Sequence, residues 1–446
     1  MDLAACVADP RTVSVLSPFQ PSAERPWDRG AAGHLLRRAG FAPSEAEVRA
    51  VLRDGPQAAV ARLVGAADES PRFEELDALG EPLAARNDIE ALRGWWLLRM
   101  RHTQRPLHAR MALFWHNHFA TSHAKVGSAA LMLQQLRTFE RHGLGRFEQL
   151  VQAVSRDPAM IVWLDGQANV KGRPNENYAR ELLELFTLGV GNYSELDIRE
   201  AARAFTGWQQ RQGRFHFGRS DHDDGHKTVF GRSGRFDGDD VVRLAVEQPA
   251  CAPFLAGKLL RELVCPEPPA ELVDALAARL RETQFDLAAT LTTLLSSEAM
   301  FEPRWRRTRI KSPVEFMLGV VRSLEMQMPA PALAEAVSQM GQPLFEPPSV
   351  KGWDDHRAWL NSATMLVRLN AVARATSQKS FRPAELRERY ELRTLDDVLA
   401  FCRNLTLDGD VPQAVQQQLD EIDGGSDDVL RRALRVLLAT PEYQMA

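Results

Sequence analysis

The chain has 446 residues, of which 44% are hydrophobic and 26% are charged, and its formal net charge is −4. This composition is typical of an ordinary globular protein, and the length allows two or three domains or one large helical body. The slightly acidic balance gives no reason to expect a nucleic-acid partner.

Residues 1–30 are rich in Pro, Ser and Ala and are predicted to form an irregular N-terminal arm. They lack a basic region followed by a sustained apolar core, so the sequence predicts no signal peptide and favours a cytoplasmic location. No window of the chain approaches the roughly 20 apolar residues that a membrane helix needs, which predicts no membrane span.

Four cysteines, Cys6, Cys251, Cys265 and Cys402, show neither a C-x-x-C spacing nor a close pair. This arrangement argues against a zinc knuckle and against a disulfide framework. Buried free thiols are therefore expected.

From residue 31 the apolar residues follow a helical period. Ser44 and Glu47 have the spacing of a capping box at the start of a helix. Further helical stretches are predicted at 57–64, 88–113, 129–142 and 147–154.

The stretch 155–191 contains a predicted helix whose two faces differ strongly. A helix predicted over 175–187 places Ala179, Leu182, Leu183 and Phe186 on one side. The opposite side carries Asn177, Arg180, Glu181 and Glu184, with Glu176 at its margin. This polar face is either a solvated surface or one wall of a polar site.

Residues 207–238 are rich in Gly, His, Asp and Arg, and short alternations around 213–237 predict a small hairpin or an ordered loop. Helical patterns then resume and continue to the C-terminal region. The predicted fold is therefore mainly α: a large multi-helix globular body with one small β-like excursion around residues 213–237.

Several long motifs, taken together and in this order, resemble the DUF1800 family of uncharacterised bacterial proteins. They are HLLRRAGFAP (34–43), WHNHFATS (115–122), NVKGRPNENYARELLELFTLGVGNYSELDIREAARAFTGW (169–208), HDDGHKTVFG (222–231), IKSPVEF (310–316) and LFEPPSVKGW (344–353). The resemblance implies a helical domain over residues 31–370, with 371–446 as a C-terminal helical extension packed on the same body. It also implies proteins that are often exported and often encoded beside DUF1501 proteins, so a DUF1501-type protein is a possible partner.

His116 and His118 are the first candidate ligands. On a helix they point about 200° apart, so they share one ion only if the helix ends between them. The helical pattern predicts that His118 is buried and that His116 is more exposed. The alternatives are a buried imidazole with a hydrogen-bond partner and a metal or catalytic role.

Glu176, Glu181 and Glu184 are the candidate carboxylates of the central helix. Glu176 and Arg180 stand at i,i+4 and are predicted to form an ion pair. Glu181 and Glu184 stand at i,i+3, so their like charges repel unless an arginine, a cation or water offsets the repulsion. A solvated face and a functional wall are both compatible with this pattern.

The loop HDDGHK at 222–227 is the densest ligand-like cluster in the chain. His222 and Asp223 are candidate metal ligands, and Lys227 is a candidate anion clamp. The spacing matches no calcium or zinc signature, so an ordered loop with an Asp-capped turn is the alternative. KGW at 351–353 is predicted to be a packed loop, with an aromatic wall for a ligand as the alternative.

These motifs together suggest one polar site that holds a divalent metal ion. The expected ligands are His116, His118, Glu176, His222 and Asp223. Glu181 or Glu184 is expected to act as general base, and Lys227 or Arg180 to stabilise negative charge. Hydrolysis by a metal-bound water is the favoured chemistry, and a metal-dependent oxidoreductase uses the same ligand types. The competing hypothesis is a non-enzymatic helical scaffold that binds a partner protein.

Overall fold

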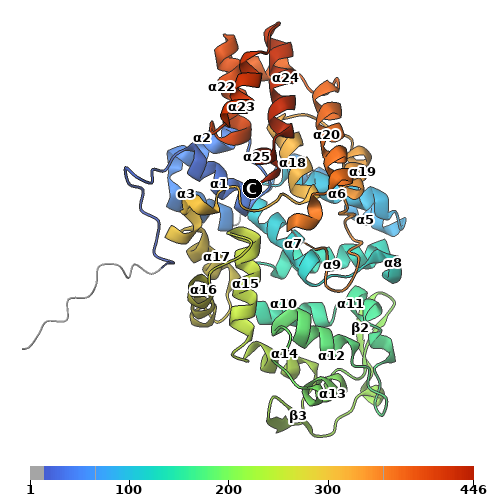
Figure 1. Ribbon diagram of the computed structural model, residues 1–446. Helices are drawn as coiled ribbons and strands as arrows, with labels where there is room; N and C mark the ends of the chain where they lie inside the picture. The colour runs from blue at the N-terminus through green and yellow to red at the C-terminus, as the bar shows by residue number, and fades with distance from the viewer. Residues whose placement is uncertain (1–14, 66, 355) are drawn as a thin grey trace, which may run out of the picture.

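Helices make up most of the fold (Figure 1), as the sequence predicts. The computed structural model describes residues 15–65, 67–354 and 356–446. Half of the predicted N-terminal arm, together with Cys6, lies outside these residues. Cys251, Cys265 and Cys402 are buried free thiols, which confirms the prediction for the described cysteines.

The N-terminal helices extend across the middle of Figure 1, from its left side to its right. Asp28 caps the first of them, and Ser44 and Glu47 form the predicted capping box of the second. The helices are α1 (Arg29–Ala39), α2 (Glu45–Asp54), α3 (Pro56–Val64), α4 (Pro71–Asp77), α5 (Gly80–Ala85), α6 (Ile89–His102), α7 (Pro106–His118), α8 (His123–Val126), α9 (Ala129–His142), α10 (Phe147–Ser155) and α11 (Pro158–Trp163).

The central predicted helix is shorter and less regular than its pattern suggests. α12 (Asn177–Glu181) has about one and a half α-helical turns. A π-helix, η2 (Leu182–Thr187), follows it. The Leu188 N–H donates to the Leu183 carbonyl five residues back, at 3.0 Å. The prediction of one α-helix over 175–187 is therefore wrong in its second half. Its apolar face is confirmed, because Ala179, Leu182, Leu183 and Phe186 are all buried.

Two small antiparallel hairpins follow α13 (Glu195–Ala204), at the bottom of Figure 1, and confirm the β-like excursion. β1 (Trp208–Arg211) pairs with β2 (Arg214–Phe217), and β3 (Lys227–Val229) pairs with β4 (Arg232–Gly234). Each hairpin reverses at a glycine with positive φ, Gly213 and Gly231, where an L side chain would be strained.

Of the remaining helices, those up to residue 295 lie in the lower half of Figure 1, and those from residue 313 on build its upper part. The two groups together are α14 (Gly238–Val246), α15 (Cys251–Leu263), α16 (Ala270–Glu282), α17 (Leu287–Leu295), α18 (Pro313–Ser323), α19 (Ala330–Gln339), α20 (Ser362–Ser377), α21 (Pro383–Arg389), α22 (Leu395–Leu407), α23 (Gln413–Asp420), α24 (Ser426–Ala439) and α25 (Pro441–Gln444). One cluster of buried apolar side chains extends from Phe19 to Tyr443 and includes residues of both α1 and α24. None of the described helices has the length and apolar character to cross a membrane.

A buried ion cluster joins helices that are far apart in the sequence. Glu315, in the first turn of α18, accepts hydrogen bonds from Arg110 of α7 at 2.6 Å and from Arg309 at 3.0 Å. Arg110 also binds Glu262 of α15 and the Gly40 carbonyl at the end of α1. Arg110 is 1% exposed and Glu315 is 4% exposed, so water does not replace these contacts.

We expect the substitution Glu315→Gln to destabilise the protein by about 3–5 kcal/mol. It keeps the volume of the side chain but leaves two buried guanidiniums without their shared carboxylate. The urea midpoint measures this loss. Glu282→Gln, at an exposed glutamate of α16, is the control, and equal midpoints for the two variants would contradict the expectation.

Candidate functional site

His116 fixes a distant loop. Its Nε2 accepts the N–H of Phe345 at 3.1 Å, and the carbonyl of Phe345 accepts the N–H of His123 at 2.8 Å. These bonds hold Phe345 at φ +65°, a conformation that is rare for an aromatic residue. The prediction that His116 is the more exposed histidine is wrong: it is 2% exposed, because the 344–353 loop folds over its side of α7.

Asn117 binds the same loop one residue further on. Its Oδ1 accepts the N–H of Trp353 at 2.8 Å. Gly352 has φ +91°, and a Cβ there would lie 2.3 Å from Asn117 Oδ1. Trp353 is buried, which confirms the packed-loop interpretation of the KGW motif.

His118 is buried, as predicted, and supports the π-helix. Its Nε2–H donates to the Phe186 carbonyl at 3.0 Å, one of the carbonyls that the end of a helix leaves unpaired. Burial lowers the pKa of His118 to about 3, so the ring is neutral at pH 7. Its Nδ1 has no hydrogen-bond partner among the described residues, and aromatic rings, including Phe114 and Phe119, surround it.

The polar face of the central helix is largely paired within the protein. Arg180 binds Glu176 at 3.1 Å, as predicted, and Glu195 at 2.9 Å. Glu184 accepts the hydroxyl of Tyr193. The pKa of Glu181 is raised by partial burial and by the neighbouring Glu184, which is the like-charge repulsion that the spacing predicts.

The 222–227 loop is an ordered structure held by its own charged residues. Arg203 of α13 donates to Asp223 at 2.8 Å, and this contact lowers the pKa of Asp223 to about 2. Lys227 is 1% exposed, and its ammonium donates to the carbonyls of Asp223 and Gly225. His222 Nδ1–H donates to the Thr206 carbonyl at 2.9 Å. The loop is therefore a capped turn, and Lys227 clamps backbone rather than presenting its charge to solvent.

These partners bear directly on the predicted metal centre. Within the described ranges, no group of three or more His, Cys, Asp or Glu residues is placed to hold a metal ion. The backbone hydrogen bonds of His116, His118 and His222 each occupy one ring nitrogen, which by itself is compatible with a ligand role. The two predicted carboxylate ligands, however, are bound to arginines: Glu176 to Arg180 and Asp223 to Arg203. The donor set does not fit one shared centre, and it supports no reaction step through a metal.

We therefore expect the purified, tag-free protein to contain no stoichiometric bound metal. Elemental mass spectrometry of the wild type, His118→Ala and His222→Ala measures this directly. The two histidines lie in separate packing environments here, so the structure does not predict that both hold one ion. Near-stoichiometric metal that is lost in both variants would therefore restore the shared site.

A buried acid next to the WHNHFATS motif has no counterpart in the sequence interpretation. Asp157 is 3% exposed, and its Oδ1 accepts the amide of Gln135 at 2.9 Å and the N–H of Met160 at 3.1 Å. Its Oδ2 has no partner among the described residues. Burial raises the pKa of Asp157 to about 7. The only sequence signal is the pair Asp157–Pro158, which predicts a helix start.

We expect Asp157→Asn to stabilise the protein at pH 8 but not at pH 4. Between its ordinary pKa and about 7, the unfolded chain has lost the Asp157 proton while the folded chain keeps it, so stability falls as pH rises. The difference between variant and wild type should grow to on the order of 4 kcal/mol above pH 7. Denaturant unfolding from pH 4 to pH 8 checks this, with the half-exposed Asp165→Asn as control. Parallel pH profiles for the wild type and Asp157→Asn would refute it.

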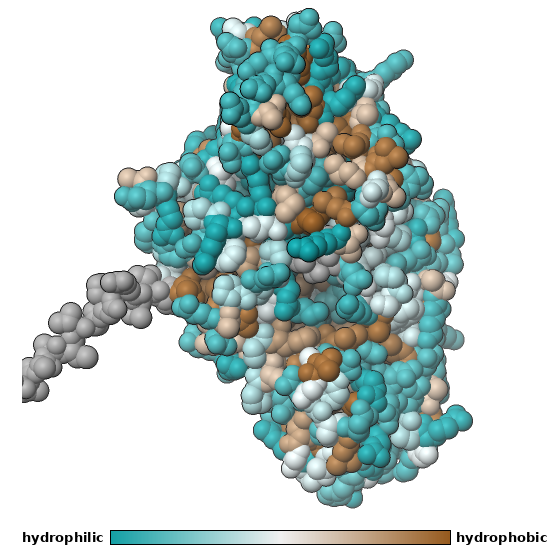
Figure 2. Space-filling model, viewed as in Figure 1, coloured by the Kyte–Doolittle hydropathy of each residue, from teal (hydrophilic) through white to brown (hydrophobic). Residues whose placement is uncertain are grey.

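The outward face of α20 exposes two leucines. Leu366 is 59% exposed and Leu369 is 37% exposed, and the neighbouring outward residues Ser362, Ala363, Asn370 and Ser377 carry no charge. Figure 2 shows apolar side chains gathered over α20 at the upper right. The sequence signal is a helix that is apolar on two sides, since Val372 and Ala375 are buried on the other face.

Two hollows border this face of α20. The α19 hollow, of 270 Å³, lies between α19 and α20, where Ala336 and Arg374 line it. The α25 hollow, of 500 Å³, is lined mainly by apolar groups, among them Met365 and Met445. An apolar helix face with a hollow on each side has the shape of an interaction site.

Comparison with known proteins places the chain in a family but assigns it no activity. No curated protein and no solved structure matches it. One family model, described as a protein of unknown function (DUF1800), matches residues 34–445. The match includes the C-terminal helices beyond residue 370 as well as the motifs from α7 to the 344–353 loop. The chain belongs to the DUF1800 family.

Proposed function

We propose that this protein is a helical scaffold that binds a partner protein through the outward face of α20. The observation that carries the proposal is a helix face with two exposed leucines between two hollows, with the exposed Arg374 at its edge. Fully burying an exposed leucine side chain stabilises the buried state by roughly 1.5–3 kcal/mol, so covering the exposed parts of both leucines favours association.

The shape of the surface favours an amphipathic helix of the partner. An apolar ridge between two depressions accepts side chains at i, i+3 and i+4 spacing from a second helix. Arg374 and Glu335 line the α19 hollow, so charged groups stand at the edge of the apolar area. An apolar centre with a polar rim is the usual anatomy of a protein interface. The DUF1501-type proteins suggested by family context are the first candidates.

The metal-dependent hydrolase and the metal-dependent oxidoreductase stay predictions from the sequence alone. Of their two proposed bases, Glu184 binds Tyr193, whereas Glu181 makes no hydrogen bond or ion pair with a described residue. Their proposed charge stabilisers, Arg180 and Lys227, are engaged in internal contacts. The scaffold hypothesis expects such internal pairing together with an exposed apolar surface elsewhere, and both features occur here.

We expect a double variant, Leu366→Glu with Leu369→Glu, to lose binding to a purified DUF1501-type protein encoded beside the gene. Two charges on the ridge should weaken the complex at least about a hundredfold, since central apolar anchors carry most of the binding energy of an interface. Isothermal titration calorimetry with the full chain measures the dissociation constant.

The matched control is Val190→Glu with Leu196→Glu, which charges two other exposed apolar residues, one in α13 and one shortly before it. It should bind like the wild type. Light scattering of the chain alone provides a second reading: a wild-type dimer that the α20 variant converts to monomer would show that the surface serves self-association. Absence of binding, or equal affinity of the α20 variant and the control, would also overturn the proposal.

A further inference from the structure

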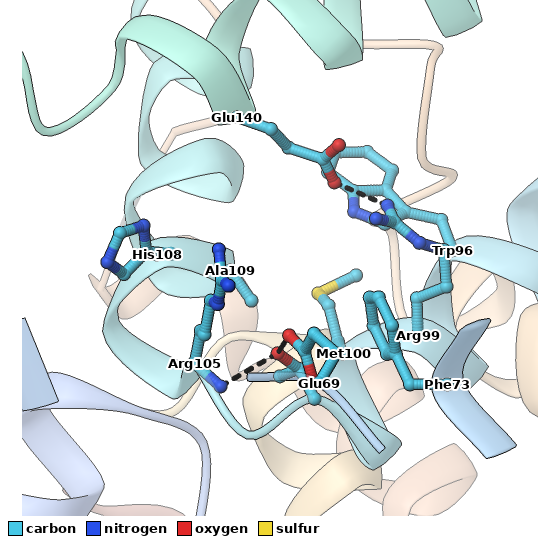
Figure 3. A pocket seen from close by; sticks show the side chains of 10 residues that line it. Glu69, Phe73, Trp96, Arg99, Met100, Arg105, His108, Ala109 and Glu140 are labelled. Carbon is cyan, nitrogen blue, oxygen red and sulfur yellow. Dashed lines mark hydrogen bonds and ion pairs between the residues drawn. The ribbon is translucent and has the colours of Figure 1, made fainter. Parts of the chain in front are cut away.

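A small cavity lies between α4, α6, α7 and α9 (Figure 3), apart from α20, and no residue of the predicted metal site lines it. Its volume is 150 Å³. A cavity of about this size accommodates a benzene ring. The ligand that it admits is therefore a small molecule rather than a peptide or a nucleotide.

One wall of the cavity is apolar and rigid. Phe73, Trp96 and Met100 line it, and Trp96 and Met100 are each 1% exposed. Trp96 packs in turn against His116 and Phe345, so the contacts of the WHNHFATS motif hold this wall from behind. Aromatic and thioether groups of this kind bind an apolar side chain.

The charges above this wall neutralise one another. Arg99 forms ion pairs with Asp77 and Glu140, and Arg137 forms ion pairs with the same two carboxylates. Two guanidiniums and two carboxylates leave no net charge at this end. His108 is also uncharged at pH 7, because burial lowers its pKa by more than the hydrogen bond from its Nε2–H to the Val64 carbonyl raises it.

The opposite end carries one positive and one negative group that do not pair with each other. Glu69 accepts the Thr103 hydroxyl at 2.5 Å and the Gln104 N–H at 2.7 Å, both uncharged donors. Arg105 donates its Nε–H to the Ala67 carbonyl, and its two terminal nitrogens make no hydrogen bond or ion pair with a described residue. Figure 3 shows Arg105 at the left of the cavity and Glu69 below it, with Phe73 and Trp96 on the right.

We propose that this cavity binds a free α-amino acid with an apolar side chain. The terminal nitrogens of Arg105 would take the carboxylate in a two-bond fork, and Glu69 would take the ammonium group. The apolar side chain would lie against Phe73, Trp96 and Met100. A zwitterion carries one negative and one positive group, which match the separate charges of Arg105 and Glu69. A simple anion or a simple cation matches only one of them.

Calorimetry on the full chain tests this with L-phenylalanine and two analogues that each lack one charge. The analogues are 3-phenylpropanoate, without the ammonium group, and phenethylamine, without the carboxylate. We expect saturable binding of the amino acid, with each analogue about tenfold weaker or more. L-leucine should bind as well, because the apolar wall has no feature that demands a ring.

Two variants then assign each charge to its residue. Arg105→Gln should weaken L-phenylalanine about tenfold and leave phenethylamine unchanged, while Glu69→Gln should weaken L-phenylalanine and leave 3-phenylpropanoate unchanged or tighter. The exposed neighbour Arg141→Gln is the control for a lost positive charge. The ratio of the dissociation constants of two ligands, measured on one variant, does not depend on that variant's stability.

Two results would overturn the proposal. One is the absence of saturable binding for both amino acids up to millimolar concentration in a folded wild-type protein. The other is 3-phenylpropanoate binding as tightly as L-phenylalanine, with no effect of Glu69→Gln, which would make the cavity a simple anion site. Neither result bears on the α20 surface, whose test uses a protein partner.

Discussion

The carboxylate of Glu315 is the contact on which the arrangement of the helices depends. It sits in the first turn of α18, where it also accepts the N–H of Ser312 as part of a capping box. The same two oxygens receive Arg309 and Arg110, and Arg110 reaches on to α15 and to the end of α1. A buried carboxylate without such partners would take up a proton, but here the guanidiniums hold its pKa well below the usual range. One local cap thereby becomes a junction between four parts of the chain.

Local pattern predicts a helix where its start and its apolar face are specified by residues close in sequence. Ser44 with Glu47 and Ser312 with Glu315 start their helices through neighbours three residues away, and the apolar face of 179–186 follows from spacing alone. The π-helix was not predictable in this way. It depends on the Thr187 hydroxyl binding the Leu182 carbonyl and on His118, which is 68 residues away, binding the Phe186 carbonyl.

The candidate site was harder to predict for the same reason. Helical geometry predicts that His116 lies on the outer side of α7 and is therefore exposed. The 344–353 loop covers this side of the helix, so the histidine is buried. The loop is more than two hundred residues away in sequence, so no local pattern reports the contact. Asp157 is similar: its sequence context predicts a helix cap, and only the surrounding core makes it a buried acid with a raised pKa.

These contacts also give polar residues of the motifs a structural task. WHNHFATS and LFEPPSVKGW are distant in sequence, yet His116, Asn117 and His123 bind the backbone of Phe345 and Trp353. The polar residues of these motifs therefore hold an irregular loop in place, a task that needs specific donors and acceptors as much as catalysis does. In turn, the loop supports Trp96 from behind, and Trp96 forms the wall of the cavity beside Arg105. The α20 face and the cavity lie outside the motifs, so a search for chemistry within the motifs alone passes over both.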